Sequence, residues 1–118
     1  MIIFFSMTAK MQITPTALGI SEKSMAILLQ ILNAQPHICY AKIFGSREKG
    51  NYKEGSDIDL CLFVDNEFPI KNKLHMMRAF EESSLPYKVD LLIFSELQNE
   101  NLKEHIELVG KTIYERAN

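Results

Sequence analysis

Ile-Phe-Gly-Ser at residues 43–46 and Asp-Ile-Asp at residues 57–59 decide how this chain of 118 residues folds. The first motif ends a mostly apolar stretch, residues 39–44, which is typical of a short β-strand. The second motif opens another such stretch, residues 57–64. The sequence therefore predicts two strands joined by a polar loop.

The second predicted strand has two chemically different faces. Successive side chains of a strand point in opposite directions, so Asp57 and Asp59 share a face with Cys61 and Phe63. The opposite face is entirely apolar and consists of Ile58, Leu60, Leu62 and Val64. The alternation thus directs two carboxylates side by side from a strand that is anchored in a core, an arrangement suited to a hard cation.

Gly45 and Ser46 provide the complementary half of a nucleotide site. A glycine directly after a strand allows the backbone to turn tightly and to approach a ligand without interference from a Cβ atom. The serine offers a hydroxyl and an N–H at the start of a short helix, a position that favours anions. Asp-x-Asp alone is often a loop or helix-capping feature, and Gly-Ser alone is a weaker signal still. Their combination, with ten residues between them, favours a site for a nucleoside triphosphate with magnesium.

A third aspartate, Asp90, lies in the middle of a third predicted strand, residues 87–94. Aspartate is unfavourable in a strand and costly to bury without a partner. If the second and third strands are neighbours, Asp90 joins Asp57 and Asp59. Charges about 4 Å apart repel by roughly 4 kcal/mol at an effective dielectric constant of about 20, so three pairs cost about 12 kcal/mol, as much as the stability of a domain. Lys88 could offset part of this repulsion, and two magnesium ions could offset all of it.

Together these motifs resemble those of the minimal nucleotidyltransferases of the DNA polymerase β superfamily. The matching residues are Gly45-Ser46-Arg47-Glu48-Lys49-Gly50, Ser56-Asp57-Ile58-Asp59-Leu60 and Val89-Asp90-Leu91. The family signature is Gly-Ser, then Asp-x-Asp at the spacing seen here, then a later aspartate on a strand. The resemblance covers most of the chain, roughly from Ser21 to Arg116. Members often read Gly-Ser-Arg-Ala-Arg-Gly, so Glu48 and Lys49 depart from the pattern by adding an acid while keeping a cation.

The resemblance implies a metal-dependent nucleotidyl transfer with ATP as substrate and two Mg²⁺ ions as cofactors. It assigns nucleotide binding to Gly45, Ser46, Arg47 and Lys49, and catalysis and metal binding to Asp57, Asp59 and Asp90. The chemistry of Arg47 agrees, because a guanidinium group forms paired hydrogen bonds with phosphate oxygens. The alternative is that residues 47–56 are merely a solvated loop.

The acceptor of the nucleotide is not written in these motifs. By resemblance, minimal members of the family act with a small helical HEPN-type protein, commonly as antitoxin to a toxin, and transfer AMP to one of its tyrosine hydroxyls. The resemblance therefore implies a HEPN-type partner and a heteromeric complex. Two alternatives stay open, a non-catalytic antitoxin that acts by contact and a small-molecule nucleotidyltransferase of the antibiotic-resistance type.

Composition narrows the class of protein further. The net charge of −2 argues against a broad nucleic-acid-binding face. No apolar run approaches the roughly 18 residues of a membrane span, so a cytoplasmic protein is expected. Cys39 and Cys61 lie in predicted strands and are interpreted as reduced core or site-lining thiols. The histidines are scattered without the spacing of metal ligands, so a zinc site is not expected.

Helices are predicted on either side of the strands along the chain. Residues 1–19 are expected to form a loosely ordered lead-in and residues 20–118 a single domain. A first helix opens at Ser21, a second covers residues 70–83, and a third begins at Ser95 with apolar residues at helical spacing as far as Ile113. The predicted fold class is α/β (α+β), a small mixed β-sheet with helices on one face and the acids on the other.

The second predicted helix is broader on its apolar side than a single stripe requires. Ile70, Leu74 and Met77 form one stripe, and Met76 and Phe80 widen it. We interpret the extra width as core rather than as a partner surface.

Overall fold

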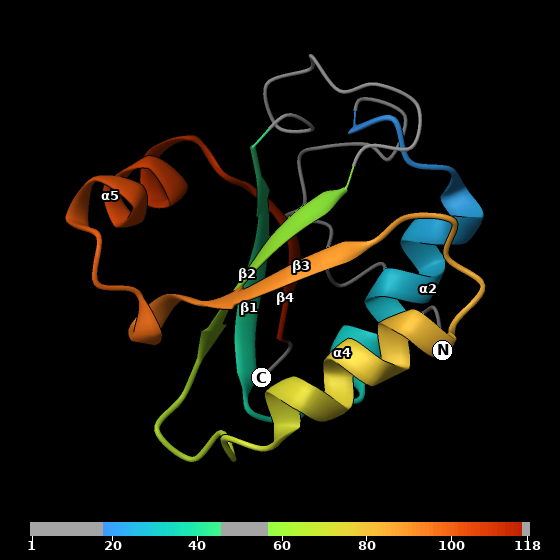
Figure 1. Cartoon of the computed structure of the whole chain (residues 1–118), viewed down its shortest axis with the longest axis horizontal. Helices are drawn as coiled ribbons and strands as arrows, with labels where there is room; N and C mark the ends of the chain where they lie inside the picture. The colour runs from blue at the N-terminus through green and yellow to red at the C-terminus, as the bar shows by residue number, and fades with distance from the viewer. Residues whose placement is uncertain (1–17, 46–56, 117–118) are drawn as a thin grey trace.

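The computed structural model describes residues 18–45 and 57–116, and its centre is one mixed sheet (Figure 1). The strands are β1 (Ile38–Phe44), β2 (Ile58–Val64), β3 (Val89–Ile93) and β4 (Lys111–Glu115). They lie in the order β3-β2-β1-β4. β1 is antiparallel to both β2 and β4, whereas β2 and β3 are parallel. The predicted mixed sheet and the predicted adjacency of the second and third strands are therefore confirmed.

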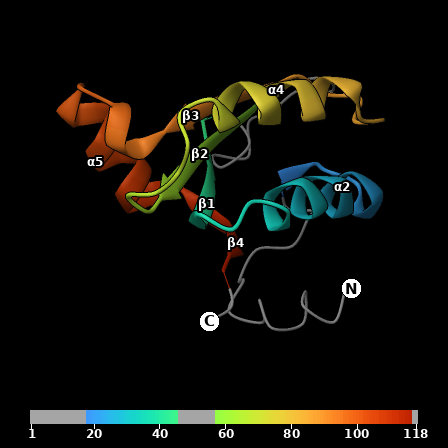
Figure 2. The ribbon, with the colours of Figure 1, turned by 90° about the horizontal axis from the view of Figure 1, so that it is seen from below.

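Two helices, α2 (Glu22–Asn33) and α4 (Asn72–Glu82), cover one face of the sheet (Figure 2). α2 begins after Ser21, whose hydroxyl accepts a hydrogen bond from the Ser24 N–H at 3.0 Å. The main core lies between these helices and the sheet. It contains Ile58, Leu60 and Leu62 of β2, so the wholly apolar face of this strand is buried as predicted.

The remaining long helix, α5 (Glu100–Val109), lies across the sheet from α2 and α4 (Figure 2). Its Ile106 forms a second, smaller core with Cys61 and Phe63 of β2. Lys42 Nζ donates a hydrogen bond to the Glu107 carbonyl at 3.0 Å, which places a cation at the helix C-terminus, where the dipole favours it. α5 thus covers the acid-bearing face at the end away from the acids. The predicted arrangement, with helices on the opposite face alone, did not include this helix.

The C-terminal part of the chain differs from the sequence-based expectation. No continuous helix runs from Ser95 to Ile113; residues 94–96 form a short 3₁₀ turn, η3 (Phe94–Glu96). α5 starts later, after Asn99, whose side chain accepts a hydrogen bond from the Leu102 N–H at 3.1 Å. It ends at Gly110, and Ile113 belongs to β4. The prediction was wrong because Ile113 of the strand follows Ile106 and Val109 of the helix at helical spacing, so the sequence pattern did not show where the helix ends.

The apolar stripe of α4 also differs in part from its prediction. Met76 and Phe80 are buried, so the extra width of this helix is core, as interpreted. Ile70 and Leu74, by contrast, are 80% and 68% exposed, and Met77 is 38% exposed. The helix therefore faces the core with a different stripe from the one that the spacing suggested.

Two predictions concern the ends of the chain and membranes. The expected lead-in, residues 1–19, falls mostly outside the described residues and stays a prediction, while Leu18 and Ile20 belong to the core. None of the helices in the described ranges combines the length and hydrophobicity needed to cross a bilayer.

A polar cluster joins three strands at the end of the sheet away from Gly45. His37 Nδ1 and Arg116 Nη1 lie 3.1 Å and 3.3 Å from Asp65 carboxylate oxygens. Arg116 also donates to the Pro36 carbonyl at 2.8 Å. Although desolvation raises the pKa of Asp65, hydrogen bonds from His37, the Glu67 N–H and Arg116 outweigh it, and the net pKa is lowered.

We expect Asp65→Asn to lower the melting temperature at pH 7, because the paired carboxylate stabilises the folded state. A carboxyl with a lowered folded-state pKa contributes fully above its unfolded value of about 3.9, and the contribution is lost as pH falls through the folded-state pKa. The difference between wild type and variant should therefore shrink below about pH 4 in thermal melts. Glu67→Gln, at an exposed side chain nearby, is the control, and an equal effect there would contradict the prediction.

Both cysteines are free thiols, as predicted, and Cys61 is buried beneath α5. Burial raises the pKa of the Cys61 thiol to about 12, although nearby Lys42 lowers it slightly. Because the thiolate is the reactive form, iodoacetamide at pH 8 should modify Cys61 only after denaturation. Peptide mapping by mass spectrometry measures this, and labelling of Cys61 at equal rates in folded and unfolded protein would contradict it.

Candidate active site

Gly45 follows β1 and turns the chain beside an aspartate of β2. Its φ of +84° lies in the left-handed region that favours glycine. A Cβ atom placed on Gly45 would lie 2.5 Å from Asp59 Oδ2, so only a glycine leaves room for this carboxylate. The tight turn that the sequence predicted here is present, and it lies against the Asp59 carboxylate.

Asp59 and Asp90 lie side by side on neighbouring strands. They are direct partners in the parallel register of β2 and β3, and register partners present their side chains on the same face. Phe44, the last residue of β1, is the partner of Asp59 on the other side. The predicted meeting of these two carboxylates is therefore present, and Asp57 lies just before β2, exposed, at the same end of the sheet.

The acids influence one another electrostatically. The pKa of Asp59 is raised, first because the group is partly buried, then because of the negative charges of Asp90 and Asp57. All three predicted acids thus contribute to one local field. A cation bound near Asp59 would relieve this unfavourable field.

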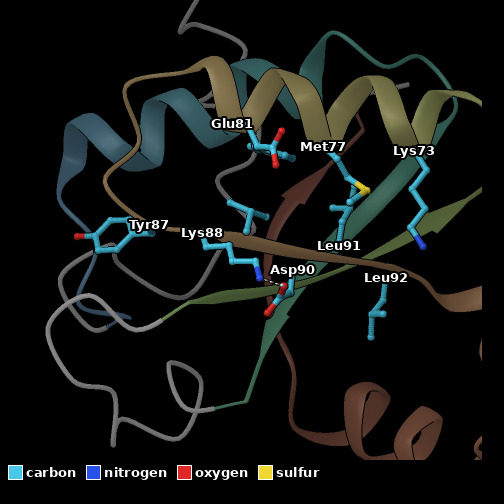
Figure 3. A pocket seen from close by; sticks show the side chains of 10 residues that line it. Lys73, Met77, Glu81, Tyr87, Lys88, Asp90, Leu91 and Leu92 are labelled. Carbon is cyan, nitrogen blue, oxygen red and sulfur yellow. Dashed lines mark ion pairs between the residues drawn. The ribbon is translucent and has the colours of Figure 1, made fainter.

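Within the described residues, Lys88 forms an ion pair with one of the acids. Its Nζ lies 4.0 Å from Asp90 Oδ1, as the dashed line in Figure 3 shows. The Lys88 side chain is 74% exposed, so water screens this ion pair strongly. Lys88 therefore lies where it was predicted to offset the repulsion between the acids, but it stabilises them only weakly.

The donor set fits magnesium rather than a fully caged metal. Within residues 18–45 and 57–116, no group of three or more His, Cys, Asp or Glu side chains is gathered closely enough to hold a metal ion. Magnesium usually binds one or two carboxylates together with substrate phosphates and water. Asp59 and Asp90 are adjacent, and the charge of Asp90 contributes to the raised pKa of Asp59. Together they are a donor set of this kind. Ser46, Arg47 and Lys49, the other predicted nucleotide-binding residues, lie outside the described residues.

A pocket of about 440 Å³ adjoins the acids between α4 and β3 (Figure 3). Met77 and Phe80 line it from the helix, and Leu91, Asp90 and Lys88 line it from the strand. Sequence reasoning missed this pocket, because it depends on how α4 crosses an edge strand. The available signal was the apolar stripe through Met77, because part of this stripe is exposed in the structure rather than buried in the core.

A mixed sheet that presents acids on adjacent strands opposite a glycine turn has the architecture of a nucleotidyltransferase of the polymerase β type. The family described as "Polymerase beta, Nucleotidyltransferase" matches residues 27–118. The chain therefore belongs to this family and is a nucleotidyltransferase.

Among curated proteins, the chain is similar to the "Probable protein adenylyltransferase MntA" of Haemophilus influenzae. The two are 33% identical over 99 residues, which cover 84% of this chain and 86% of that protein.

Among solved structures, the fold is similar to that of a chain in a crystal structure of a toxin–antitoxin with AMP-PNP. The TM-score is 0.64 at 19% identity, over 78% of this chain and 73% of that one. It is also similar to a chain in the structure of a tri-AMPylated Shewanella oneidensis HEPN toxin in complex with MNT antitoxin. There the TM-score is 0.60 at 17% identity, over 80% of this chain and 72% of that one.

Gly45→Ala should both destabilise the fold and impair the site. Left-handed backbone costs a residue with a Cβ about 1–2 kcal/mol, and the new methyl group would also displace the Asp59 carboxylate. Gly19, with φ of +71° just before α2, is the control for a glycine in the left-handed conformation. We expect Gly19→Ala to lower the melting temperature without loss of nucleotidyl transfer, and Gly45→Ala to lower both. Full activity in Gly45→Ala would contradict the assignment.

Proposed function

We propose that this nucleotidyltransferase moves AMP from ATP to a hydroxyl acceptor, namely a tyrosine of a HEPN-type partner, and thereby acts as an antitoxin. The observation that carries the chemistry is the register pairing of Asp59 with Asp90, beside the turn at Gly45. The curated relative's name, a probable protein adenylyltransferase, supports the reaction type. The complex of an MNT antitoxin with a tri-AMPylated HEPN toxin supports the class of acceptor.

In this proposal the turn after β1 holds the triphosphate. Gly45 lets the backbone approach the β- and γ-phosphates closely, because it adopts a left-handed conformation and has no side chain in the way. Ser46 would add its hydroxyl and N–H, and Arg47 and Lys49 would add positive charge.

Asp57, Asp59 and Asp90 would hold two Mg²⁺ ions. When bound, these ions supply positive charge to the entering and leaving oxygens of the α-phosphate. The raised pKa of Asp59 is consistent with this role, because partial burial raises it first and the negative charges of Asp90 and Asp57 add to the effect. The buried apolar side chains of β2 anchor Asp59, and Asp57 directly precedes this strand.

The transfer step exchanges one phosphoester bond for another. The acceptor oxygen attacks the α-phosphorus of ATP, the bond from that phosphorus to the bridging oxygen of the β-phosphate breaks, and pyrophosphate leaves with the electron pair. Asp90, on the edge strand β3, would receive the hydroxyl proton in this proposal.

Incubation of the protein with ATP, Mg²⁺ and the product of the neighbouring gene, as the proposed HEPN-type partner, tests the proposal. Intact-mass spectrometry should show the partner heavier by one or more AMP units, and the modified residue should be a tyrosine. Tight binding of the partner without any mass shift would overturn the enzymatic proposal in favour of an antitoxin that acts by contact. Modification of small molecules but not of the partner would overturn the proposed acceptor.

Asp59→Asn should abolish AMP transfer and yet raise the melting temperature of the metal-free protein. Because the folded state binds the Asp59 proton more tightly than the unfolded chain does, the ionised group destabilises the fold once pH exceeds its raised pKa. Removing the charge should therefore stabilise the protein at pH 7 and leave its stability unchanged well below pH 4 (about the unfolded value). Mg²⁺ with ATP should raise the melting temperature of wild type more than that of the variant.

Glu104→Gln, at an exposed position on α5, is the control for the loss of one negative charge. It should retain AMP transfer and respond to Mg²⁺ and ATP as wild type does. Transfer at wild-type rate by Asp59→Asn would rule out the proposed role of this residue.

A further inference from the structure

β3 is an edge strand that pairs only on one side within the described residues. It lies at the end of the order β3-β2-β1-β4, next to β2. The Ile58 N–H donates to the Lys88 carbonyl at 2.8 Å, which fixes which peptide groups face β2. Because successive peptide groups of a strand point to opposite sides, those of Val89, Leu91 and Ile93 point toward the free edge.

The pocket beside this edge has two different walls. On one side of the strand, Leu91 faces α4, where Met77 and Phe80 form an apolar wall that is flanked by the charged side chains of Lys73 and Glu81. On the other side, Asp90 and Lys88 form a charged wall that continues into the acids at Asp59. Figure 3 shows the Leu91 and Met77 side chains on the helix side of β3 and the Asp90 carboxylate on the other side. A free strand edge therefore runs between an apolar wall and the acids.

We propose that the acceptor protein docks here as an added β-strand along the free edge of β3. Its main-chain N–H and C=O groups pair with those of Val89, Leu91 and Ile93, as in other cases of recognition by strand addition. This inference rests on the proposed function, since it names how the acceptor of that reaction is held.

Strand addition explains how a hydroxyl reaches the acids. Side chains of the docked strand alternate between the two walls. The residue opposite Asp90 points to the acid face and presents its hydroxyl there, while its two neighbours in sequence point toward α4 and contact Met77. The acceptor segment is thus an extended stretch with a hydroxyl residue between two apolar ones. Exposed Leu74, one turn before Met77, extends the apolar wall along α4.

Amide hydrogen exchange of the complex with the proposed HEPN-type partner, the product of the neighbouring gene, tests the docking directly in the absence of ATP. The Leu91 and Ile93 amides should exchange about tenfold more slowly or better on binding. The amides of β4, at the opposite edge of the same sheet, serve as internal control and should be unchanged. Protection at β4 or α5 with no change at Leu91 and Ile93 would overturn the proposal. Because this readout needs no turnover, it stands even if the chain proves to act by contact.

Kinetics of AMP transfer provide the second test. Met77→Glu places a charge in the apolar wall and should raise the KM for the partner about tenfold or more, with the KM for ATP unchanged. Leu108→Glu, at a 75% exposed position on α5, is the matched control and should leave both constants unchanged. Transfer by Met77→Glu with an unchanged KM for the partner would overturn the docking but leave the proposed function intact. Absence of transfer by wild type, with protection of Leu91 and Ile93, would overturn only the function.

Discussion

Repulsion between carboxylates at one end of the sheet is the constraint on which the rest of the structure depends. Asp59 and Asp90 are held side by side by the register of β2 and β3, and the pKa of Asp59 is raised by its partial burial and then by the charges of Asp90 and Asp57. Only a backbone that is fixed from behind can hold like charges in this way. The apolar side chains of β2 on the opposite face, Ile58, Leu60 and Leu62, are all fully buried and provide that fixation.

The face of the sheet that carries the acids is covered at one end and open at the other. Away from the acids, α5 covers the face, and Tyr40, Phe63 and Phe94 stack with ring centroids 4.3 Å and 4.5 Å apart. This stack extends from β1 across β2 to η3 and so attaches the start of the α5 segment to the sheet. At the acid end, none of the described helices packs on this face, and Asp59 and Asp90 stay only partly buried. Packing at one end therefore allows the other end to remain open.

Features that depend on local alternation could be predicted from the sequence, and those that depend on distant pairing could not. The polar-apolar alternation of residues 57–64 was sufficient to predict β2, its buried apolar face and the position of Asp59 on the other face. Asp90 was identified because an aspartate amid apolar strand residues is itself anomalous. β4 was missed because its place beside β1 is a long-range choice, and Ile113 fits a helical spacing as well as a strand. The pocket depends on which strand lies at the edge, and strand order is not a local property.

The order of groups across the sheet also has a consequence for the proposed reaction. Gly45 directly follows β1, Asp59 lies on β2 and Asp90 lies on β3. Within the described residues, the outer edge of β3 is free. An in-line displacement needs the entering and leaving oxygens on opposite sides of the phosphorus. In the proposed reaction, with the triphosphate at the Gly45 turn, an acceptor held along the free edge of β3 would attack the phosphorus from the opposite side. The edge position of the third aspartate therefore suits the proposed chemistry, since an acceptor docked beyond β3 would bring its hydroxyl directly to Asp90.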